Sequence, residues 1–157
     1  MAANFYETLL NELSEALEIE KLTPDENNSC LIKFNNNLEI QIEQEKDEES
    51  LLISASLGEV PPGKYREDVF REALKANAAP YPRQGTFGYS LDTSQLILFK
   101  LMPYEELTGD KVAAYLTPFM EKAIEWKEML EKGEVPHVIL NHSAKESSPF
   151  GLFGGLT

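Results

Sequence analysis

Residues 38–43 alternate strictly between apolar and polar side chains, and this stretch constrains the fold more than any other. Leu38, Ile40 and Ile42 take alternate positions, with Glu and Gln between them. Side chains on a β-strand point to opposite faces in turn, so the pattern predicts a strand with one buried and one acidic, solvated face. The apolar face has to pack against a second layer.

Two further strand candidates flank this one. They span residues 30–34 and 51–57, and the connections between the three are an Asn-rich turn at 35–37 and a charged loop at 45–49. These connections are too short to contain a crossover helix, so we expect an antiparallel meander. A hairpin is predicted further along, from strands at 85–90 and 95–102 joined by a turn at 92–94.

Helical spacing of apolar residues marks three other segments. The first has Asn4 as its expected N-cap and carries apolar residues from Phe5 to Leu17. The second spans about 65–77. Together the segments predict an α+β fold, an antiparallel twisted sheet with three helices in the order α-β-β-β-α-β-β-α.

The third helix is the longest. Thr108 is its expected N-cap and Gly133 its C-terminal residue in the left-handed region. Pro118 is expected either to kink this helix or to mark a later start. One apolar stripe runs along it, formed by Val112, Leu116, Phe119, Ala123, Trp126 and Leu130.

The 157 residues fit one domain, which we place at residues 1–133. Residues 134–157 are rich in Ser, Gly and Pro and are expected to form a flexible tail. The tail also holds apolar residues, which either dock on a partner or on the chain itself, or are incidental. They are Phe150, Leu152, Phe153 and Leu156.

The charge balance narrows the range of partners. With 27 acidic and 14 basic residues the formal charge is −13, and such a surface repels phosphate groups. Nucleic acid and anionic membranes are therefore not expected partners. No apolar run approaches the roughly 20 residues of a membrane span, and the first residues do not read as a signal peptide. A cytoplasmic location is expected.

The sequence offers no catalytic constellation. His137 and His142 lack further ligands at zinc spacing, and Cys30 lies among apolar residues, as a buried structural thiol does. Gly85 and Gly88 are expected where another backbone approaches a strand closely, not in a phosphate loop. We therefore expect no enzyme, no cofactor and no metal, and favour a protein-binding role.

The second helix is the main reason for that preference. Tyr65, Val69, Phe70 and Leu74 give it more apolar surface than a small sheet with two other helices needs, which is typical of an interface. The alternative is that this helix covers the far end of the sheet. Likewise, the acidic surface either selects a basic partner or only keeps the chain soluble.

Three stretches resemble the CesT family of type III secretion chaperones, the class I effector chaperones. The resemblance runs from about Phe5 to Leu130. Its residues are Phe70, Ala73, Leu74 and Asn77 in the second helix; Gly85, Phe87, Gly88, Tyr89, Leu96, Leu98, Leu101 and Pro103 in the hairpin; and Leu116, Phe119, Ala123, Trp126 and Leu130 in the third helix.

The resemblance implies a non-enzymatic homodimer in the bacterial cytoplasm. It would bind extended N-terminal segments of secreted effector proteins and deliver them to the secretion ATPase. The implied dimer interface comprises Val69, Phe70, Leu74, Phe87 and Tyr89. The implied effector-binding residues are Leu9, Leu13, Phe34, Ile40 and Ile53. The alternative is a stand-alone α+β interaction or regulatory domain unrelated to secretion.

Overall fold

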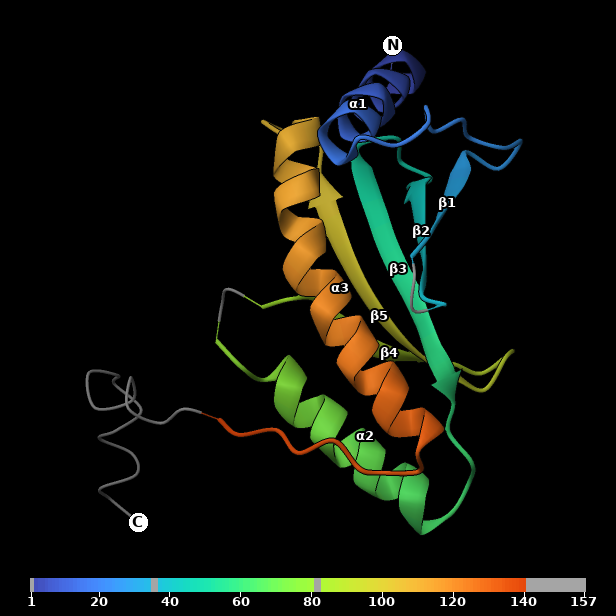
Figure 1. Cartoon of the computed structure of the whole chain (residues 1–157), viewed down its shortest axis with the longest axis vertical. Coiled ribbons are helices and arrows are strands. Elements are labelled where there is room, and N and C mark those ends of the chain that lie inside the picture. Colours follow the sequence, from blue (N-terminus) through green and yellow to red (C-terminus); the bar gives the residue numbers. More distant parts are fainter. Residues whose placement is uncertain (1, 35–36, 81–82, 141–157) are drawn as a thin grey trace, which may run out of the picture.

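The computed structural model describes residues 2–34, 37–80 and 83–140. The order of helices and strands is the predicted one, and the fold is α+β (Figure 1). The elements are α1 (Ala2–Leu17), β1 (Ser29–Lys33), β2 (Glu39–Gln44), β3 (Ser50–Glu59), α2 (Lys64–Asn77), β4 (Thr86–Ser90), β5 (Gln95–Pro103) and α3 (Gly109–Glu131).

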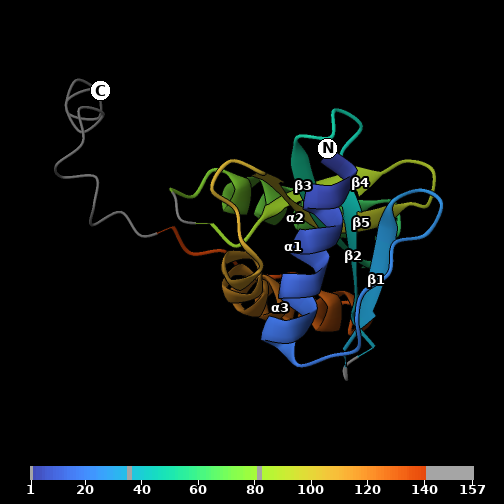
Figure 2. The same cartoon turned by 90° about the horizontal axis from the view of Figure 1, so that it is seen from above.

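The five strands form one antiparallel sheet in the order β1-β2-β3-β5-β4. The outer strands β1 and β4 are therefore its two edges. Helices α1 and α3 cross one face, and α2 packs against β4, at the opposite end of the molecule from α1 (Figures 1 and 2). No helix covers the other face among the described residues, so the molecule has two layers.

The core lies between the sheet and the helices. Alternation in the strands places Ile40, Ile53 and Leu98 on the inner face, where they are fully buried. The apolar stripe of α3 packs on this face, and the ring of Trp126 lies 4.1 Å from that of Phe87, between centroids. The stripe of α3 therefore packs on β3 and β4, and the alternating strands supply the apolar inner face beneath the helices.

Helix boundaries differ in part from the predictions. The proposed N-cap at Asn4 is wrong, because α1 already begins at Ala2. The helix ends at Leu17: Glu18 has a φ of 54°, and the Ser14 hydroxyl accepts a hydrogen bond from the Leu22 amide.

For α3, Thr108 is the N-cap as predicted, and its hydroxyl accepts a hydrogen bond from the Lys111 amide. Gly133 has a φ of 70°, also as predicted. A later start at Pro118 is wrong, because the helix runs unbroken from Gly109 to Glu131. The N-cap and the intact apolar stripe on both sides of Pro118 outweigh the hydrogen bond that proline cannot make.

Residues 134–140, here called the C-terminal strap, pack along α2 (Figure 1). Pro136 is buried, and Val138 contacts the core. The expected flexible tail from residue 134 therefore has a docked first part. His142 and the apolar residues Phe150, Leu152, Phe153 and Leu156 lie outside the described residues. No helix in the described part of the chain is both long and apolar enough to span a bilayer.

Candidate protein-binding surfaces

The sheet face that no helix covers is one candidate binding surface, here called the open face. Strand alternation puts Leu31 of β1, Leu52 of β3, and Ile97, Phe99 and Leu101 of β5 on it. Leu31 and Leu101 are 49% and 45% exposed, and the other three are half-buried. Accessible apolar side chains on a wide sheet face are a feature of a protein-binding surface.

Polar residues divide the open face. Gln41 and Ser54 lie in one cross-strand row between Leu31 and Phe99. Both side chains carry hydrogen-bond donors and acceptors, and Gln41 Nε2 already donates to Ser29 Oγ at 2.9 Å. A cavity of about 230 Å³ lies on this face and is lined by Leu31, Asn37, Glu39, Gln41, Ser54, Ser56 and Ile97.

The β1 edge adjoins the open face and offers main-chain groups. The Phe34 amide bonds to the Leu38 carbonyl, so alternation turns the main-chain groups of Leu31 and Lys33 outward. Those of Ser29 are already bonded to Asp25. For Leu31 and Lys33 the described part of the chain provides no main-chain partner on this side. An extended segment can therefore add to β1.

The second candidate surface lies between α2 and the edge strand β4, and is here called the α2–β4 face. Leu74 is 68% exposed, and Phe70 and Tyr89 are half-buried with their rings edge-to-face at 5.0 Å. Arg66 lies over the Tyr89 ring, 5.3 Å from its centroid. The cavity on this face holds about 170 Å³ and is lined by Phe70, Ala73, Leu74, Asn77, Phe87, Gly88, Tyr89 and Leu96.

Asn77 joins the two elements of this face. Its side-chain amide donates to the Phe87 carbonyl at 3.0 Å, and its side-chain oxygen accepts from the Phe87 amide at 2.8 Å. The edge of β4 is therefore closed to strand addition at Phe87, in contrast to β1. The Asn77 side chain therefore links α2 to β4 at Phe87, and the face presents the side chains of Phe70, Leu74 and Tyr89.

Neither cavity has the size of a small-molecule site. Ligand pockets usually enclose roughly 300–1,000 Å³. The cavities on the two surfaces, at about 230 and about 170 Å³, are smaller. No group of three or more His, Cys, Asp or Glu side chains that would hold a metal occurs in residues 2–34, 37–80 and 83–140. The arrangement suits a macromolecular partner.

The residues that the resemblance implied for the dimer interface fall into two groups. Phe70, Leu74 and Tyr89 are accessible on the α2–β4 face. Val69 and Phe87 are buried beneath it and support it from the core. The second helix was expected either to form an interface or to cover the far end of the sheet. In the structure α2 covers that end and still exposes Leu74.

The residues implied for effector binding lie mostly in the core. Leu9, Leu13, Ile40 and Ile53 are at most 2% exposed, because α1 and α3 fill the space over the inner face of the sheet. Only Phe34 is partly accessible. In this chain Leu9, Leu13, Ile40 and Ile53 pack between the helices and the inner face of the sheet. The accessible apolar residues of the sheet lie on its open face.

The sequence did contain a signal for the open face. Residues 96–102 form an almost continuous apolar run, which is typical of a strand with apolar residues on both faces. Leu31 is also apolar but lies between Cys30 and Ile32, so in a strand its side chain points to the face opposite to theirs. The expected close approach of another backbone is confirmed at Gly85, where an added Cβ would lie 3.1 Å from the Phe99 carbonyl oxygen. At Gly88 it is wrong, because the nearest group is the side-chain ring of Phe99, 3.2 Å from an added Cβ.

A protein-family model matches residues 8–127, and the family is described as the Tir chaperone protein (CesT) family. The match covers most of the chain, which therefore belongs to this family. These are secretion chaperones without enzymatic activity, so the prediction that the chain is not an enzyme is confirmed. No curated protein matches the sequence.

Solved structures share the fold. A chain in the HopA1–SchA chaperone–effector complex is 22% identical, with a TM-score of 0.65 over 79% of this chain and 94% of that chain. A chain in the structure of the Yersinia pestis type III secretion chaperone SycH with a fragment of YscM2 is 17% identical. Its TM-score is 0.60 over 77% of this chain and 98% of that chain. A chain in the ExoT–SpcS complex from Pseudomonas aeruginosa is 16% identical, with a TM-score of 0.60 over 77% of this chain and 96% of that chain. They confirm the predicted chaperone-like fold.

Proposed function

We propose that this protein is a type III secretion chaperone that binds the N-terminal segment of secreted effector proteins. The family membership supports the class, and similar folds occur in chaperone–effector complexes. The observation that carries the binding mode is the open face beside the β1 edge, where the main-chain groups of Leu31 and Lys33 have no outward partner among the described residues. Together they suit an extended segment better than a folded domain, because strand addition needs a partner with free main-chain groups.

The bound segment would pair with β1 at Leu31 and Lys33. Its alternate side chains would reach the apolar residues of the open face, which start at Leu31. Glu39 and Glu43 flank the same face on β2. They favour a segment with basic residues, because opposite charges across an interface speed and direct association. Held in this way, the segment stays unfolded and competent for secretion.

The proposed active form is a homodimer that pairs through the α2–β4 face. Phe70, Leu74 and Tyr89 supply accessible apolar contacts there, and Asn77 holds both elements in place. This face lies at the β4 end of the sheet, away from the β1 edge. Dimerisation therefore leaves both copies free to bind effector. We further propose that the dimer works in the bacterial cytoplasm and hands its cargo to the secretion ATPase.

The test is a pull-down with the tagged full chain from lysate of the native organism, followed by mass spectrometry and limited proteolysis. Protection of an extended N-terminal segment of a secreted protein supports the proposal. Recovery of folded partners alone, in a lysate shown to contain effectors, would instead support a stand-alone interaction domain.

A pair of variants links the binding to the surface. Leu31→Glu on the open face should weaken capture of the protected segment by about tenfold or more. Leu91→Glu is the matched control, because Leu91 is 86% exposed in the β4–β5 turn and belongs to neither surface. Equal capture by both variants would contradict the assignment of the open face.

A further inference from the structure

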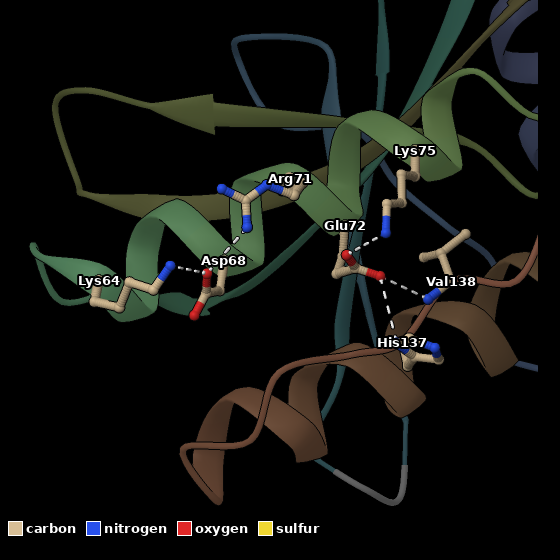
Figure 3. A network of polar contacts seen from close by, with 7 residues as sticks. All are labelled: Lys64, Asp68, Arg71, Glu72, Lys75, His137 and Val138. Atoms are coloured by element: carbon tan, nitrogen blue, oxygen red, sulfur yellow. Dashed lines mark hydrogen bonds and ion pairs between the residues drawn. The ribbon is translucent and has the colours of Figure 1, made fainter.

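The side of α2 that carries Tyr65 and Glu72 is in contact with the C-terminal strap. Figure 3 shows Glu72 beside His137 and Val138 of the strap. Glu72 is only 6% exposed, although it is a carboxylate on a surface helix. Its Oε1 accepts the Val138 main-chain amide at 2.9 Å, and its Oε2 lies 2.9 Å from Lys75 Nζ. A buried carboxylate needs such partners, and the strap provides one of them.

The strap is bound in the manner of a short extended peptide. At one end the Tyr65 hydroxyl donates to the Glu134 carbonyl at 2.8 Å, and at the other the Val138 amide donates to Glu72. Between these two main-chain bonds Pro136 is buried. His137 Nδ1 lies 3.9 Å from Glu72 Oε1. Main-chain bonds at both ends and a proline between them are typical of peptide recognition.

Much of the strap remains outside the core. Ile139 is 83% exposed, and Val135 and His137 are also exposed. The strap follows Gly133, whose φ of 70° lets the chain turn away from the end of α3. It joins no strand of the sheet. A segment that joins no sheet and leaves several of its side chains exposed belongs to the low-stability part of a structure.

We propose that this side of α2 is a binding site for an extended peptide, which the chain's own residues 134–140 occupy and can leave. The ligand it fits has a free main-chain amide for Glu72, an apolar side chain at the position of Val138 and a proline two residues earlier. The site is separate from the α2–β4 face, because Tyr65 and Glu72 lie on a different side of the helix from Phe70 and Leu74. The inference goes beyond the proposed function and does not depend on it.

The test uses the full chain and a labelled peptide with the sequence of residues 133–140 as the probe. Val138→Pro in the chain removes the strap's amide donor and leaves Glu72 intact, so it empties the site. We expect this variant to bind the peptide about tenfold or more tightly than the wild-type chain does in a fluorescence anisotropy titration. Adding Glu72→Ala to the variant should abolish that gain.

Two controls keep the experiment specific. Asp68→Ala breaks the ion pairs of Asp68 with Lys64 and Arg71 on the same helix, away from the strap, and should bind like the wild type (Figure 3). A peptide with proline in place of the Val138 residue should not bind to any variant. Pro136→Gly is a second way to loosen the strap, should Val138→Pro not fold.

Equal peptide binding by the wild-type and both strap variants would overturn the proposal, and so would unfolding of both strap variants, since the strap would then be a fixed part of the fold. Effector capture is measured in a separate experiment. A failure of the peptide-binding test therefore leaves the proposed chaperone function standing, and a failure of effector capture leaves the peptide site standing.

Discussion

Gly109 lies where the first turn of α3 meets α1, and its amide donates to Glu12 Oε2 at 2.8 Å. An added Cβ would lie 2.6 Å from the main-chain nitrogen of Leu13, which cannot move without shifting α1. We expect Gly109→Ala to destabilise the fold by about 2–3 kcal/mol in urea unfolding.

Gly133→Ala is the control for that variant. It meets no atom within 4 Å and bears only its left-handed φ. It should cost about 1 kcal/mol. Similar losses for the two variants would show that α1 and α3 adjust to each other more freely than this contact implies.

Glu72 gives the strap a pH dependence. The main-chain amide of Val138, and then Lys75, hold the pKa of Glu72 below its usual value. A carboxylate whose pKa is depressed in the folded state stabilises that state above its unfolded pKa of about 4.3, and the stabilisation is lost as pH falls through the folded pKa. The melting temperature of the wild type should therefore exceed that of Glu72→Gln between about pH 6 and 8.

The two melting temperatures should converge as the pH falls through the folded pKa of Glu72, which lies below its unfolded value, because Glu72 is then protonated in both states. Asp68→Asn serves as the reference for general acid effects. A difference between wild type and Glu72→Gln that persists at low pH would show that the amide substitution acts through packing and not through charge.

At the scale of elements, the α2–β4 face predicts a clean dimer variant. Leu74→Asp places a charge at a side chain that is 68% exposed in one chain, so the fold should survive. The dimer dissociation constant should rise about tenfold or more by sedimentation or light scattering. Phe70→Asp should give monomers or aggregates, because Phe70 is already half-buried.

Leu91→Asp is again the matched control, and it should leave the dimer unchanged. A stable dimer with Leu74→Asp would remove α2 from the interface.

The β1 edge predicts a backbone test. Lys33→Pro removes an amide that points to the open edge and leaves the β1–β2 ladder intact, because proline is tolerated on edge strands. It should weaken capture of the effector segment about tenfold. Lys33→Ser controls for the lost charge. The ion pair of Lys33 with Glu39 in the wild type is exposed, with 3.9 Å between the charged atoms, so its loss should cost little stability. Loss of capture with both variants would point to charge instead of strand addition.

The predictability of these elements followed the strength of local signals. The alternation at 38–43, the stripe of α3 and the cap at Thr108 each depend on neighbouring residues, and all appear in the structure. Which of two apolar faces is covered depends on how α1 and α3 pack over the whole sheet. Core and surface apolar residues recur with the same period along a helix or strand. The sequence therefore could not show that Leu9 and Ile53 are buried and not accessible for binding.

At the scale of the whole molecule, the structure predicts how far the C-terminal part of the chain contributes to stability. The buried apolar core among the described residues runs from Tyr6 to Trp126, and Val138 of the strap packs against it. Deletion of residues 144–157 should therefore shift the melting temperature by less than about 2 °C. Deletion of 134–157 also removes Pro136 and the partner of Glu72 at Val138, and should lower the melting temperature by about 5 °C. Both shifts can be read from calorimetry on the two variants at pH 7. Equal shifts would mean either that the strap adds nothing to stability or that residues 144–157 also contribute to the fold.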